Sequence, residues 1–105
     1  MPAQNTVENE QATSDLAIHC EHKPSPAKLD VLGVDDWPVW KKEPSTFAWH
    51  YDKTEICYIL RGRFTVTADG GEAQQFGRGD LINFPAGLSC TWEIEKAVEK
   101  HYRFD

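Results

Sequence analysis

Residues 55–68, EICYILRGRFTVTA, contain two short runs of β-branched and aromatic residues, which Arg61-Gly62 separates. Runs of this kind, bounded by glycine, are typical of β-strands. In the second run the apolar side chains fall at every other position and alternate with threonines, which is the pattern of a half-buried strand. The segment therefore predicts two strands joined by a turn at Arg61-Gly62.

Five further runs of the same kind lie around this segment. They are Thr46–Tyr51, Glu72–Phe76, Leu81–Phe84, Leu88–Ile94 and Val98–Phe104. Most are separated by short sequences rich in glycine, aspartate or proline, which supply the positive φ angles and bends that hairpins need. No helical period is long enough to provide the crossovers of a parallel sheet. Seven closely spaced strands predict an all-β fold, an antiparallel sandwich or barrel.

The first run leaves open which face is buried. Glu55 shares one face with Cys57 and Ile59, whereas the other face carries three larger apolar side chains. A carboxylate that points into an apolar interior must find a partner, shift its pKa upward or bind a metal. Glu55 is therefore the first candidate for a functional residue.

Composition divides the chain of 105 residues unevenly. All of its aromatic residues lie between Trp37 and Phe104, whereas residues 1–28 are mostly polar and include three prolines. We expect one compact domain over residues 29–105 and a flexible N-terminal arm over residues 1–28. The alternative for the arm is that Leu16–Cys20 docks as an edge strand, because a few apolar residues can cover an exposed sheet edge.

Charge and cysteine content exclude several classes of function. The net charge is -6, so the chain lacks the basic surface that collects a nucleic-acid backbone. No stretch approaches the roughly 18–20 apolar residues that span a bilayer, so we expect no membrane insertion. Three cysteines, an odd number without CxxC spacing, indicate reduced thiols and a cytoplasmic protein.

Two sequence motifs resemble those of the cupin superfamily. Glu55–Gly62 matches the acid, six residues, glycine spacing that closes the first cupin motif, and Gly79–Gly87 matches the glycine and proline spacing that opens the second. Trp37–Trp40, Phe84–Trp92 and Lys100–Phe104 look closer to one branch, the small single-domain cupins grouped with the ureidoglycine aminohydrolase cupin domain. The resemblance implies a double-stranded β-helix barrel of jelly-roll type.

The resemblance also implies a metal site of three histidines and one glutamate, which this chain keeps only in part. The matching positions hold Ala48, His50, Glu55 and Cys90. His50 and Glu55 are thus expected ligands, with Cys90 as a thiolate replacement. Such a set would suit zinc better than manganese or iron, with nickel as a further possibility, or the barrel holds no metal.

Each of these residues also has a purely structural interpretation. Alternation places Phe47, Trp49 and Tyr51 on the apolar face of their strand, so His50 is a surface histidine unless that strand bulges. Cys90 falls on the apolar side of its own strand and could be a small buried hydrophobe. Glu55 could form an ion pair with Lys53 or with an arginine at a strand end, and the His19–His22 tract could bind metal adventitiously.

We expect a small polar molecule to bind in the barrel interior. Besides Glu55, the expected pocket residues are Trp49, Tyr51, Cys57, Cys90 and Trp92. In one hypothesis a divalent metal polarises a small carbonyl or amide-like substrate, with Glu55 as the catalytic residue. In the others the barrel is a metal-free binding or regulatory protein, or its interior is filled and it acts through its surface. A homodimer would cover free sheet edges.

Overall fold

The structure, a computed structural model, describes residues 16–105. These residues form one short helix, a turn of 3-10 helix and seven strands. In chain order they are β1 (His19–His22), α2 (Pro26–Leu32), η1 (Val34–Asp36), β2 (Val39–Lys42), β3 (Ser45–His50), β4 (Glu55–Ala68), β5 (Ala73–Gly77), β6 (Asp80–Phe84) and β7 (Ser89–Phe104).

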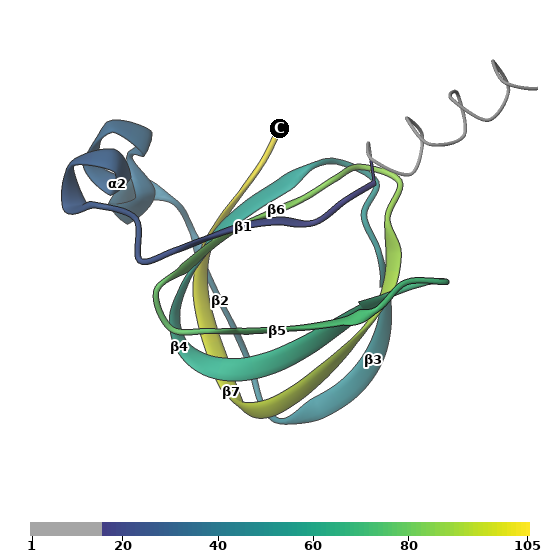
Figure 1. The fold of residues 1–105 in the computed structure, drawn as a ribbon. Helices are drawn as coiled ribbons and strands as arrows, with labels where there is room; N and C mark the ends of the chain where they lie inside the picture. The colour runs from purple at the N-terminus through teal and green to yellow at the C-terminus, as the bar shows by residue number, and fades with distance from the viewer. Residues whose placement is uncertain (1–15) are drawn as a thin grey trace, which may run out of the picture.

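All strand pairs are antiparallel and belong to one sheet. The order is β1-β6-β4-β7-β2, and in addition β3 pairs with β7 and β5 pairs with β4. Figure 1 shows this sheet curled around a common interior, with β1 and β6 on the side opposite β3. The all-β barrel predicted from the strand pattern, and the jelly-roll type that the resemblance implies, are confirmed.

Strands β4 and β7 are each twice as long as the sequence predicts. The turn expected at Arg61-Gly62 is instead a bulge in one continuous strand, where the β4–β7 register shifts. Gly62 has φ of +109°, and a Cβ atom at this position would lie 2.5 Å from the backbone oxygen of Ala97. The bulge bends the strand and changes which side chains point inward, from Ile59 before it to Phe64 after it.

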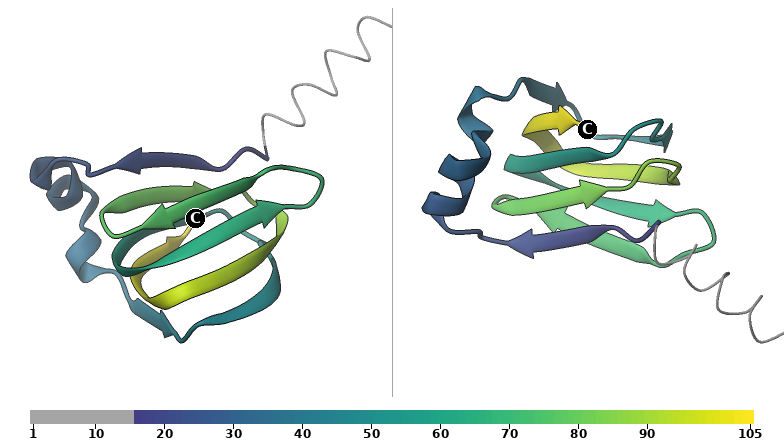
Figure 2. Two further views of the ribbon diagram at one scale, coloured as in Figure 1. Left: turned by 60° about the horizontal axis from the view of Figure 1, so that its bottom comes forward. Right: turned by 90° about the horizontal axis from the view of Figure 1, so that it is seen from above.

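The predicted boundary at residue 28 falls inside α2, which begins after Ser25 caps it. On its N-terminal side, β1 pairs with β6 over four residues. Figure 2 shows β1 lying along the barrel and α2 at one end of it. Residues 19–22 of the expected arm therefore belong to the sheet, because β1 covers the open edge of β6. The alternative of an edge strand at Leu16–Cys20 lies close to the observed β1; residues 1–15 lie outside the described residues.

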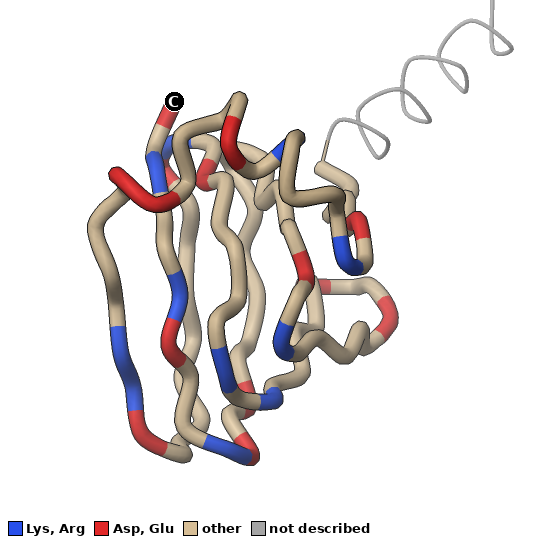
Figure 3. The backbone as a smooth tube through the Cα atoms, turned by 90° about the vertical axis from the view of Figure 1, so that its left-hand side faces the viewer, with Lys and Arg blue, Asp and Glu red and all other residues tan. Residues whose placement is uncertain are grey.

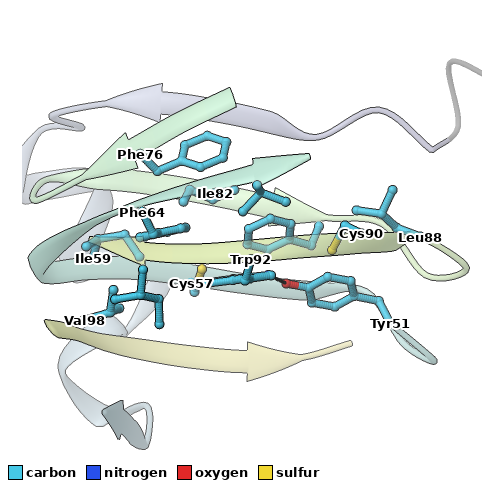
Figure 4. Close-up of a cluster of buried hydrophobic side chains, with 13 residues drawn as sticks. Tyr51, Cys57, Ile59, Phe64, Phe76, Ile82, Leu88, Cys90, Trp92 and Val98 are labelled. Carbon is cyan, nitrogen blue, oxygen red and sulfur yellow. Dashed lines mark hydrogen bonds between the residues drawn. The ribbon is translucent and has the colours of Figure 1, made fainter. Parts of the chain in front are cut away.

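Aromatic and branched side chains from most strands fill the interior (Figure 4). Trp92 lies at its centre and stacks on Phe64, with ring centroids 4.3 Å apart. Tyr51 stacks on Phe84 at 4.9 Å. The inward positions predicted for the Leu88–Ile94 run, including Trp92, are confirmed by their burial.

Acidic and basic residues are interspersed along the strands and loops rather than gathered by sign (Figure 3). Among residues 16–105, no helix has the length and apolar character needed to cross a membrane.

Candidate functional site

A cavity of about 170 Å³ lies on the inner side of β2, β3 and β7. Its floor consists of buried residues and its rim of two half-exposed aromatic rings, Trp49 (48% exposed) and Phe104 (50%). Nine residues line it: Trp40, Phe47, Trp49, Tyr51, Glu55, Trp92, Lys100, Tyr102 and Phe104. The cavity is thus an aromatic pocket whose walls carry one acidic and one basic side chain. We call it the aromatic pocket below.

Glu55 and Lys100 form an ion pair at the floor of the aromatic pocket. Lys100 Nζ donates to Glu55 Oε2 at 2.5 Å, and the two side chains are 6% and 4% exposed. Glu55 begins β4 and Lys100 lies on the inward face of β7, so the paired strands bring together residues 45 apart in sequence. Each charge has the partner that a buried charge requires.

Two indole rings surround the ammonium group of Lys100. Its Nζ atom lies 4.7 Å from the ring centroid of Trp40 and 4.9 Å from that of Trp92. A cation over an aromatic face is attracted by the negative ring surface. The aromatic walls therefore stabilise a positive charge that the chain itself supplies.

Tyr51 contributes a hydroxyl group to the same floor. Its oxygen accepts a hydrogen bond from Trp92 Nε1 at 3.2 Å. Burial, and then the nearby Glu55 carboxylate, raise the pKa of the Tyr51 phenol far above its ordinary value. Tyr51 is therefore a neutral donor at physiological pH and not a general base.

The predicted metal ligands His50 and Cys90 point to opposite faces of the sheet. In the β3–β7 pair His50 lies opposite Ser89, and Trp49 lies opposite Cys90. Opposite residues share a face and consecutive residues alternate. His50 therefore points outward, where its Nδ1 atom lies 2.7 Å from Ser89 Oγ. Alternation along the strand predicted an outward-pointing His50, and this is confirmed. The cupin motif implied an inward-pointing metal ligand, and this is wrong because β3 has no bulge before His50.

The third predicted ligand, Glu55, is held by Lys100 instead. An ammonium group 2.5 Å from the carboxylate repels a divalent cation at the same place. The residues that line the aromatic pocket include neither histidine nor cysteine. The donor set in this barrel does not fit the metal that the motif implies.

Cys57 and Cys90, both expected in the pocket, lie outside its lining. Figure 4 shows their sulfur atoms well apart within the buried cluster. Burial raises the pKa of the Cys57 thiol to about 12, and burial followed by the charge of Asp69 raises that of Cys90 to about 11. Both thiols are protonated at neutral pH, which does not favour a role as nucleophile, and both side chains pack in the buried core.

Of the expected pocket residues, Trp49, Tyr51, Glu55 and Trp92 do line the cavity. Sequence reasoning missed Lys100 and the aromatic residues Trp40, Phe47, Tyr102 and Phe104 as pocket residues. Alternation does place Lys100 on one face with Tyr102 and Phe104, and this was the available signal. A lysine is so seldom buried that the signal is easily set aside.

An antiparallel jelly-roll barrel with a pocket among its inward-pointing side chains is the architecture of the cupins. The chain belongs to the EutQ-like cupin family, whose model matches residues 29–102. A search of the curated proteins finds no match. The narrower similarity to the ureidoglycine aminohydrolase branch stays a prediction.

Solved structures agree with this assignment. A DUF861 family protein from Thermotoga maritima is 45% identical, with a TM-score of 0.82 over 85% of this chain and 100% of the other. An ethanolamine utilization protein Q (EutQ) from Salmonella typhimurium is 24% identical, with a TM-score of 0.57 over 63% of this chain and 53% of the other. The Clostridium difficile EutQ protein is 18% identical, with a TM-score of 0.58 over 83% of this chain and 66% of the other. The last two share the fold.

Proposed function

We propose that this protein binds a small, planar, uncharged molecule in the aromatic pocket without a metal ion. The molecule has an apolar body that stacks between aromatic rings and one polar end, amide-like or ureido-like, that meets Glu55 and Lys100. The observation that carries the proposal is the buried Glu55–Lys100 pair at the floor of a cavity with aromatic walls.

The ion pair supports a ligand that both donates and accepts hydrogen bonds. Lys100 has three N–H donors, of which one reaches Glu55, and the Glu55 carboxylate keeps acceptor capacity on Oε1. A carbonyl oxygen of the ligand would accept from Lys100 while its N–H group donates to Glu55. An ionic ligand would add an unpaired charge to a site that is already neutral, at a cost in desolvation.

Cavity volume limits the size of the ligand. On the order of 150 Å³ is enough to hold benzene, and drug-sized molecules need about 300 Å³ or more. The cavity here is about 170 Å³. We therefore expect a single-ring compound or one of comparable size, with any larger substituent passing between the rim residues Trp49 and Phe104.

The experiment is a binding screen read by intrinsic fluorescence and by thermal shift. Three of the four tryptophans line the pocket, so a ligand that enters it should change the emission. We would compare benzamide and phenylurea with benzoate and benzylamine, in buffer containing EDTA. We expect the uncharged compounds to bind and to raise Tm, and the two ions to bind at least about tenfold more weakly.

Two variants locate the binding. Trp49→Ala removes one rim residue and should weaken binding, whereas His50→Ala changes the next residue, which points outward, and should leave it unchanged. Binding that needs added zinc or manganese, or that His50→Ala abolishes, would contradict the proposal and support the metal-dependent hypothesis. Absence of binding by every compound would favour a barrel that acts through its surface.

A further inference from the structure

Strands β1 and β6 bring together three residues with different donor atoms. His22 lies opposite Asp80 in this pair, and Cys20, two residues earlier on β1, projects to the same side as His22. Together they offer one sulfur, one imidazole nitrogen and one carboxylate oxygen, and these atoms all lie within 4.8 Å of one another. None of the three residues lines the aromatic pocket.

The distances between these atoms are close to those of a metal site. His22 Nδ1 lies 2.5 Å from Asp80 Oδ1 and 4.0 Å from Cys20 Sγ. Zinc binds sulfur at about 2.3 Å and nitrogen or oxygen at about 2.0–2.2 Å, so tetrahedral ligands of one ion stand about 3–4 Å apart. Small rotations of the exposed His22 side chain and the partly buried Cys20 side chain would lengthen the His22–Asp80 contact and shorten the contact to Cys20.

Asp80 is already oriented for this role. Its Oδ2 atom accepts a hydrogen bond from the backbone N–H of Gly77 at 2.9 Å, which leaves Oδ1 facing His22. The Asp80 side chain is only 8% exposed, whereas that of His22 is 72% exposed. A carboxylate held by a second hydrogen bond is typical of metal ligands, and the open side at His22 gives an ion access.

We propose that Cys20, His22 and Asp80 form a zinc site at the β1–β6 edge, with water as the fourth ligand. The mixed sulfur, nitrogen and oxygen set fits zinc or cobalt(II) and does not fit calcium or magnesium, which take oxygen ligands. The ion would connect β1 to β6 across 58 residues of sequence and hold the N-terminal strand on the sheet. This site is independent of the function proposed for the aromatic pocket.

Cobalt(II) gives the most direct test, because it reports its own ligands. A thiolate-to-cobalt charge-transfer band appears only if the Cys20 sulfur itself binds the ion. We would titrate the full-length chain with cobalt(II), displace the cobalt with zinc, and measure Tm with and without zinc.

The chain offers matched variants for this titration. His22→Gln and Cys20→Ser each remove one ligand, whereas His19→Gln removes a histidine of the same strand that is not part of the cluster. Residues 1–15 contain neither histidine nor cysteine. Asp80 is left unchanged because its carboxylate also caps the turn before β6.

We expect one cobalt ion per chain, with the thiolate band, in the wild type and in His19→Gln, and a higher Tm with zinc in both. Affinity should fall at least about tenfold in His22→Gln, and Cys20→Ser should lose the thiolate band. Glu55→Gln should keep the band, provided that circular dichroism shows it folded, because the barrel interior is not involved. Two results would overturn the proposal: less than one equivalent of bound cobalt per chain without a thiolate band, or equal cobalt affinity in His22→Gln and the wild type. The three residues would then form a His22–Asp80 contact and no metal site.

Discussion

Glu55 and Lys100 are each buried and each paired, so removing one leaves the other as an unpaired charge in the interior. We expect Glu55→Gln and Lys100→Met each to lower the free energy of unfolding by about 3–5 kcal/mol. The double variant should recover most of that loss, because it leaves no charge behind. Urea unfolding of the four proteins gives the coupling energy directly. If the two losses simply add, the pair does not act as a unit.

The Glu55–Lys100 pair also shows which properties of a single residue can be predicted from the sequence and which cannot. The position of Glu55 on an apolar face indicates that it needs a partner or a metal, and burial with a partner is what the structure shows. The identity of that partner depends on the β4–β7 register, which no local pattern contains. His50 shows the converse, since alternation on its own strand was a better guide than alignment to the cupin motif.

At the scale of a single strand, the bend of β4 depends on Gly62. An alanine there would meet the Ala97 oxygen at 2.5 Å and would keep a φ of +109° that side chains rarely adopt. We expect Gly62→Ala to lower the free energy of unfolding by at least about 2–3 kcal/mol. Gly70→Ala is the matched control, since Gly70 also has positive φ but has open space around it. Equal losses in the two variants, measured by urea unfolding, would show that the close approach to Ala97 does not matter.

Strand positions were predicted well and strand continuity was not. The runs Glu55–Leu60 and Arg63–Ala68 were both placed correctly, yet they are one strand, and the same holds for the two runs within β7. In β4, a glycine between the two runs is compatible with a hairpin turn or with a bulge, and only the pairing with β7 decides between them. β2 was missed because its two lysines and the preceding proline obscure its alternation.

At the scale of the whole molecule, the N-terminal boundary at residue 28 stays a prediction, and β1, which lies before it, pairs with β6 of the barrel. The family model begins at residue 29. The match to the Thermotoga protein covers 85% of this chain, more than residues 29–105 could supply, so it extends into the segment that holds β1. A dimer through free sheet edges stays a prediction, and β1 already covers one of those edges.

Removing β1 tests whether the barrel is complete without it. A chain that starts at residue 24 loses the partner strand of β6 and the packing of Ile18 and Cys20 against the core. We expect its free energy of unfolding to fall by about 2 kcal/mol, and its uncovered β6 edge to favour association. The matched control starts at residue 16 and keeps every described residue. Both are measured in EDTA, so that metal binding at Cys20 plays no part. Equal stability, and a molecular mass by light scattering that corresponds to the same oligomeric state, would show that residues 24–105 form the barrel without β1.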